Sequence, residues 1–165
     1  MEGARDLFVH LTASLYSGMR RVERAVSGIQ RRTSDPELVK TLGELRAVSA
    51  EQAKRLEGVL VLLDRRPAKE GSPVIAGMLD EEAAVRRERP GKQVLDVVVA
   101  KTLGDVAEYS MQMLEAMIQL AEHAGISNSA PRIADALEAS LKEHAKLRKG
   151  IRKIQLTLLG RVPPS

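Results

Sequence analysis

The sequence predicts an all-α protein. Apolar residues recur at intervals of three and four through nearly the whole chain, and the alternating pattern of β-strands is almost absent. Four such stretches approach thirty residues each, which at 1.5 Å per residue gives helices of about 40 Å, suited to lying side by side. With 165 residues and 44% apolar content, the chain is long enough for one domain, which we place at residues 1–160, followed by a tail at 161–165.

The first predicted helix covers about residues 3–31, where apolar residues form a single stripe from Phe8 to Ile29. The second begins at Pro36, because proline is tolerated in a first helical turn and Thr33, Ser34 and Asp35 are candidate caps for that turn. It ends at the segment DRRPAKEGSP, whose two prolines and glycine cannot continue a helix. These signals predict a helical hairpin followed by a linker.

A shorter apolar pattern between residues 73 and 89 predicts a small helix within a crossover. The third long helix is expected from Lys92 to His123, with Gly125 ending it as a C-terminal cap. The fourth is expected from about residue 130 to 159. The links within each hairpin are short, but the middle connection is about thirty residues long, enough to cross the bundle. One long crossover among four helices is the ferritin-like arrangement.

The two predicted hairpins also resemble each other in sequence. EQAKRLEGV at Glu51 matches EHAKLRKGI at Glu143, ninety-two residues later. LYSGM at Leu15 is echoed by EYSMQM at Glu108, ninety-three residues later. This repeat favours a duplicated helix pair related by a pseudo-two-fold axis, although so short a match can also arise by chance.

Several segments together resemble the YciE/YciF family of ferritin-like proteins over about 150 residues: DLFVHLTASLY, DPELVKTL, AKRLEGVLVLLDRRP, VLDVVVAKTLGDVAEYSMQMLEAMIQLAEHAG and ALEASLKEHAKL. The resemblance implies a compact bacterial bundle, usually dimeric and associated with stress responses. Many members carry carboxylate and histidine ligands for two metal ions.

The metal ligands that the resemblance implies are largely missing from this chain. Met19 stands where the family places a glutamate after the first-helix tyrosine, and Leu45 stands at the second-helix histidine position. The third-helix glutamate positions fall at about Ala107 and Ser110, and the fourth-helix position falls at His144. No Glu-x-x-His pair occurs in the sequence. We therefore expect that the dinuclear site is lost and that the protein needs no cofactor.

A shift of one residue in this register would make Glu108 and Glu143 fallback metal ligands beside His144, with iron as the alternative cofactor. Both glutamates fall on mostly polar helix faces, which argues against the shift. The polar residues expected inside the bundle are the following: Tyr16, Ser49, Tyr109, Ser110 and His144. His144 is either a small-ligand or mononuclear site, or a neutral core histidine bonded to serine or tyrosine; we favour the second interpretation.

Composition narrows the remaining function classes. There is no cysteine, no glycine-rich phosphate loop and no nucleophile motif, so no catalytic constellation supports an enzyme. No apolar run could span a membrane and no signal core follows the start, so we expect a cytoplasmic protein. The net charge is +4, but only three aromatic residues are available for stacking, which argues against nucleic-acid binding.

The first functional hypothesis is a non-enzymatic bundle with a structural or protein-binding role. The alternative is an iron-binding protein or oxidase with ligands placed elsewhere. A third hypothesis is a basic adaptor for nucleic acid or acidic partners, because the last helix concentrates basic residues: Lys142, Lys146, Arg148, Lys149, Arg152 and Lys153. A homo-oligomer, most simply a dimer, is expected because apolar residues lie outside the main stripes: Val9, Val61, Val97 and Ile118.

Overall fold

Six helices make up the part of the chain that this computed structural model describes, residues 2–67 and 71–164. The four long helices are α1 (Ala4–Gln30), α2 (Pro36–Leu62), α4 (Lys92–His123) and α6 (Pro131–Leu159). The crossover carries α3 (Pro73–Arg87), and α5 (Ile126–Ser129) is a single turn. The all-α class and the four long helices are confirmed. The sequence did not predict α5, because four residues are too few to show a helical period. Residues 68–70 of the predicted linker and Ser165 of the predicted tail lie outside the described residues.

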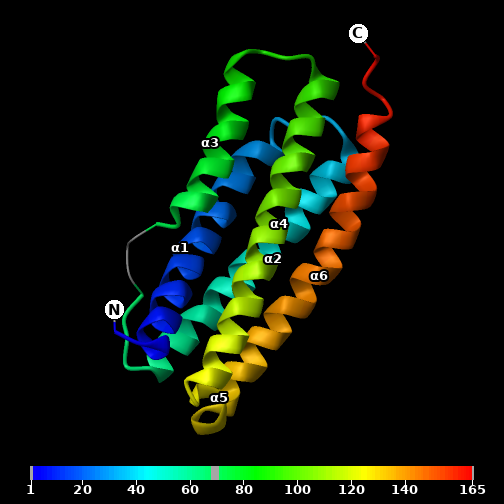
Figure 1. Cartoon of the computed structure of the whole chain (residues 1–165). Helices are drawn as coiled ribbons and strands as arrows, with labels where there is room; N and C mark the ends of the chain where they lie inside the picture. Colours follow the sequence, from blue (N-terminus) through cyan, green and yellow to red (C-terminus); the bar gives the residue numbers. More distant parts are fainter. Residues whose placement is uncertain (1, 68–70, 165) are drawn as a thin grey trace.

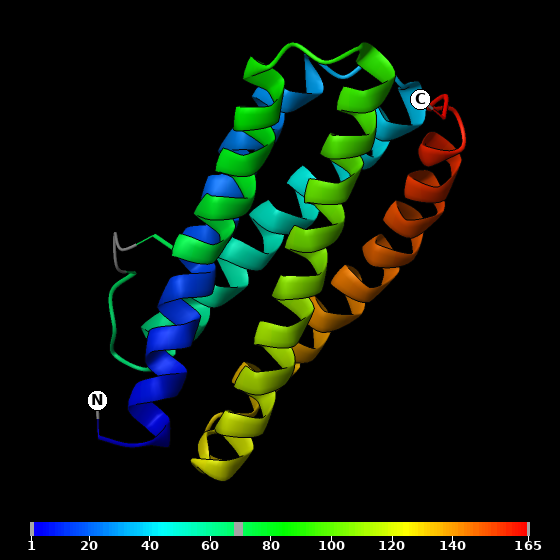
Figure 2. The ribbon, with the colours of Figure 1, turned by 45° about the horizontal axis from the view of Figure 1, so that its top comes forward.

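The four long helices form a ring around one core, because α1 and α6 each contact both α2 and α4. Figure 1 shows that α2 and α4 run in the same direction, with α1 and α6 opposed to them. The crossover makes this possible, since it returns the chain along the length of the bundle before α4 begins. The α3 helix packs outside the ring against α1 and α4, and Figure 2 shows it running beside them.

The helices begin and end where local backbone chemistry requires. The Asp35 carboxylate accepts a hydrogen bond of 2.9 Å from the Leu38 backbone N–H, and Pro36 occupies the first turn of α2. Gly125 adopts the left-handed conformation, with φ +68°, directly after α4. A side chain with a Cβ would be strained at this φ angle, so glycine allows the tight link from α4 through α5 to α6.

The core is mostly apolar and draws on all four long helices. Its largest fully buried side chains include Phe8, Leu15, Met19, Leu38, Leu42, Leu45, Leu56, Leu60, Leu103, Leu114 and Met117. Burial of this surface is the main stabilising contribution to the fold. No helix within the described residues is both long enough and apolar enough to cross a membrane.

The second apolar face expected from the sequence is mostly not a free surface. Val9, Val97 and Ile118 are partly buried and pack against the core of the same chain. Only Val61 is well exposed, at 63%. The expectation of a second free face was wrong at Val9, Val97 and Ile118, because each of them packs against the core of its own chain.

Polar contacts join three elements at the end of the bundle where α4 begins and α6 ends. Asp96, only 4% exposed, accepts hydrogen bonds from Ser34 Oγ at 2.6 Å and from the Ser34 backbone N–H at 3.2 Å. Arg161 Nη1 lies 2.5 Å from Asp35 Oδ2. Asp96 therefore connects the α1–α2 link to α4 through hydrogen bonds. Arg161, at the beginning of the predicted tail, forms an ion pair with the N-cap residue of α2.

Replacing Asp96 with alanine should lower the free energy of unfolding by about 1–3 kcal/mol, because two hydrogen bonds to a charged acceptor are lost. Urea unfolding followed by circular dichroism measures the change. Asp105→Ala is a matched control, since its carboxylate pairs with Lys101 on the surface of the same helix. Equal losses for the two variants would contradict a special role for Asp96.

Replacing Gly18 with valine should loosen the docking of α3. A Cβ at position 18 would collide with the δ-methyl group of Ile75, a completely buried residue of α3. We expect the free energy of unfolding to fall by about 1–3 kcal/mol because of overpacking. Relative to the original chain, amide hydrogen exchange should accelerate more in α3 than in α6. Gly77→Val is the control, because a Cβ there meets nothing within 4 Å. Unchanged exchange in α3 would rule out this packing role.

Candidate functional site

The positions at which the family resemblance implies metal ligands are buried in the centre of the bundle. Met19 on α1 and Ala107 on α4 are fully buried, and Leu45 on α2 is 1% exposed. Ser110, also on α4, is fully buried, and its hydroxyl donates to the Val106 carbonyl oxygen at 2.7 Å. The predicted inward orientation of these positions is confirmed. Their side chains supply apolar packing and one hydroxyl that is already bonded.

His144 is the titratable residue at this centre, and its partner is Gln52. His144 on α6 and Gln52 on α2 are both completely buried, and a short hydrogen bond joins His144 Nε2 to Gln52 Oε1. Because a carboxamide oxygen only accepts, Nε2 donates, and this tautomer leaves the lone pair on Nδ1. The expectation that His144 bonds to serine or tyrosine was therefore wrong.

The internal repeat contained a signal for this partner. Gln52 and His144 are ninety-two residues apart and hold the same place in EQAK and EHAK. A pseudo-two-fold axis brings equivalent residues of two repeats together when they lie near that axis. The equivalent positions of Gln52 and His144 in the repeat are thus the sequence signal for their pairing.

Three polar atoms of this centre have no hydrogen-bond partner among the described residues: Ser49 Oγ, Gln52 Nε2 and His144 Nδ1. Burial lowers the pKa of His144 to about 4, and the neighbouring Glu143 carboxylate offsets only part of this shift. The imidazole is consequently neutral at pH 7. A lone imidazole nitrogen beside a hydroxyl and a carboxamide is a poor donor set for iron, which in such bundles is held by several carboxylates.

The fallback metal ligands Glu108 and Glu143 do not join His144 in the core. The Glu108 side chain is 47% exposed and bonds to Arg148 at 2.8 Å. Glu143 is 38% exposed and accepts two hydrogen bonds from Arg55, at 2.7 and 2.9 Å. This pairing lowers the pKa of Glu143 and raises that of Arg55. Within residues 2–67 and 71–164, no group of three or more histidine, aspartate or glutamate side chains could hold a metal ion.

Comparison with known proteins identifies the family. Residues 3–158 match the family described as a domain of unknown function, DUF892. The chain belongs to this family. Protein YciF of Escherichia coli K12 is 23% identical over 148 residues, covering 89% of this chain and 89% of YciF. The resemblance to the YciE/YciF proteins is thereby confirmed.

Two solved structures share the fold of this DUF892 chain. The E. coli stress protein YciF superposes with a TM-score of 0.87 at 19% identity, covering 98% of this chain and all of YciF. YcfI from Rhodopseudomonas palustris, for which a structural role has been suggested, superposes with a TM-score of 0.84 at 21% identity, covering 92% and 94% of the two chains. At these identities the superpositions establish the fold and nothing about binding.

The two tyrosines predicted inside the DUF892 bundle are only partly buried. Tyr16 and Tyr109 pack against the edge of the core, whereas Ser49 and Ser110 are completely buried as expected. The buried polar centre of the bundle is therefore formed mainly by Ser49, Gln52 and His144.

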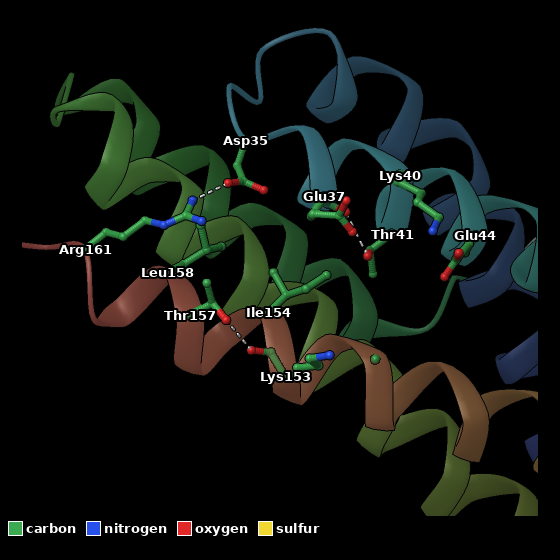
Figure 3. Close-up of a pocket in the computed structure, with 11 residues that line it drawn as sticks. Asp35, Glu37, Lys40, Thr41, Glu44, Lys153, Ile154, Thr157, Leu158 and Arg161 are labelled. Carbon is green, nitrogen blue, oxygen red and sulfur yellow. Dashed lines mark hydrogen bonds and ion pairs between the residues drawn. The ribbon is translucent and has the colours of Figure 1, made fainter.

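A surface hollow of about 370 Å³ lies between the start of α2 and the end of α6. Figure 3 shows its charged side chains: Asp35, Glu37, Lys40, Glu44, Lys153 and Arg161. The hydrogen bond from the Leu38 N–H, together with the Arg161 guanidinium, lowers the pKa of Asp35. Gly150 leaves one wall open, since a Cβ there would meet nothing within 4 Å. The charged residues among the eleven that line the hollow are of both signs, three acidic and three basic.

Proposed function

We propose that this DUF892 protein is a non-enzymatic bundle that serves as a structural or protein-binding component, with apolar packing in place of a dinuclear metal centre. The observation that carries the proposal is the filling of the core positions by Met19, Leu45 and Ala107, all at most 1% exposed. These side chains offer no oxygen or nitrogen donor. The Gln52–His144 pair then serves as a buried polar link between the two helix hairpins.

The iron-binding alternative requires donors that converge on one centre. Glu108 and Glu143 are instead engaged by arginines at the surface, with oxygen to nitrogen distances of 2.7–2.9 Å. Moving either carboxylate into the core would break an ion pair and bury an unpaired charge among apolar side chains, which is strongly unfavourable. The donor set therefore favours a scaffold over an oxidase.

Elemental analysis of protein purified from iron-supplemented cells tests the proposal. We expect far less than one equivalent of iron, manganese or zinc per chain. The same low content is expected for Glu108→Gln and Glu143→Gln, which remove the fallback ligands while keeping the size of the side chain. About two irons per chain, lost in either variant, would overturn the proposal.

A further inference from the structure

The net positive charge of the protein lies on one helix. The α6 helix contains seven basic and three acidic residues, a balance equal to the net charge of +4 for the whole chain. The rest of the chain is neutral overall, with nineteen residues of each sign. From Ala145 to the end of α6 there are five basic residues and no acidic one. This half of the helix is the positive region of an otherwise balanced molecule.

Four lysines form a row on the outer side of α6: Lys142, Lys146, Lys149 and Lys153. Their spacing of four, three and four residues places them on one face, opposite the buried His144, Leu147 and Ile151. All four are exposed, and none forms an ion pair within the part of the chain that the structure describes. The lysine row is about 16 Å long at 1.5 Å per residue.

The arrangement of the helices leaves the lysine row uncovered. The α3 helix packs on α1 and α4, on the left of Figure 1, whereas α6 forms the right edge of the bundle. Figure 2 shows the same edge position after rotation. The lysine row therefore faces away from the other helices of the described chain.

The lysine row is only one helix wide, which restricts the kind of anion that it fits. On α2, Glu37 and Glu44 are exposed and line the same hollow as Lys153. On the α4 side, Glu108 lies next to α6 through its pair with Arg148. A nucleic-acid duplex is much wider than this row, so its phosphates would lie over these acidic residues. Stacking of a single strand is also disfavoured, because the tyrosines are on α1 and α4.

The lysine row ends in an exposed apolar side chain. Leu156, three residues after Lys153 and on the same side of α6, is 69% exposed. A partner that pairs with the row could therefore also bury an apolar residue at this end. An amphipathic helix combines an acidic row and an apolar anchor in this way.

We propose that the lysine row, with Leu156, is a docking surface for an acidic amphipathic α-helix of a partner protein. The partner helix carries aspartates or glutamates at matching spacing and an apolar residue at the end that meets Leu156. The inference rests on the proposed protein-binding function and specifies the chemistry of the partner.

A designed peptide tests this docking surface. The probe is a capped, fluorescein-labelled, alanine-based helix with glutamates spaced four, three and four residues apart and a leucine placed to meet Leu156. A second peptide has the same composition, with its glutamates spread around the helix. In fluorescence anisotropy at low salt, we expect the patterned peptide to bind at least about tenfold more tightly than the scrambled one, with affinity falling as salt rises.

Charge-matched variants identify the surface that binds. Changing all four lysines of the row to glutamine should weaken binding of the patterned peptide about tenfold or more. The control variant changes four exposed cations elsewhere, Arg24, Arg31, Arg46 and Lys54, to glutamine and gives the same net charge. It should retain binding within about threefold of the original chain.

Three outcomes would overturn the docking proposal: no binding of the patterned peptide at low salt, equal weakening in the two variants, or tighter binding of a twenty-base-pair DNA duplex than of the peptide. Circular dichroism of each variant checks that the bundle is intact. Metal content is measured separately, so failure of the docking surface is distinguishable from failure of the metal-free scaffold.

Discussion

Acidification from pH 7 to pH 5 should lower the free energy of unfolding by about 2 kcal/mol through His144 alone. In the folded protein, burial lowers the pKa of this imidazole from 6.5 to about 4, whereas the unfolded chain binds a proton near pH 6.5. The unfolded state therefore holds more protons in this interval. The stabilisation from the neutral histidine is complete above pH 6.5 and decreases as the pH falls towards 4.

Urea unfolding of the original chain and of His144→Gln at pH 7, 6 and 5 measures this contribution. The variant cannot titrate at this position, so its stability should change less with pH. The pKa values of Asp35 and Glu143 are both lowered from their ordinary values of 3.8 and 4.5. Protonation of these two carboxylates therefore affects stability mainly below the range from pH 7 to pH 5. Parallel profiles for the original chain and His144→Gln would contradict burial of a neutral imidazole.

The second large effect is expected at Gln52. Gln52→Leu should lower the free energy of unfolding by about 1–3 kcal/mol, because it leaves the buried Nε2–H of His144 without an acceptor. His144→Leu should cost a similar amount by leaving the Gln52 oxygen without a donor. The double variant replaces both polar groups with apolar ones and should be close to the original stability.

A double-mutant cycle in urea measures the coupling between Gln52 and His144. The loss in the double variant should be clearly smaller than the sum of the two single losses. Ser49→Ala is a useful control, because its buried hydroxyl oxygen makes no hydrogen bond within the described residues. Strict additivity of the Gln52 and His144 losses would show that the pair does not act as a unit.

Much of the fold could be predicted from the sequence because the helix signals are local. Asp35 and Pro36 mark the start of α2, and Gly125 ends the α4 region as predicted. The periodicity also predicted correctly that Met19 and Leu45 face the core. These features depend on neighbours within one or two turns, so a single sequence contains the information that determines them.

The features that could not be predicted depend on contacts between distant elements. Gln52 is a common surface residue type, and its burial opposite His144 follows from how α2 meets α6. The partial burial of Val97 follows from its packing against the core of its own chain. The pairing of Glu143 with Arg55 likewise joins residues eighty-eight positions apart. Helical period alone does not determine which faces of neighbouring helices meet.

The most direct test of the central claim is an anomalous difference map from crystals soaked in manganese or iron. No peak is expected next to His144 or next to Met19, Leu45 and Ala107 in the core, because these residues supply one free nitrogen donor and three apolar side chains. Strong paired peaks beside these residues, with carboxylates turned inward from the surface to surround them, would contradict the central claim.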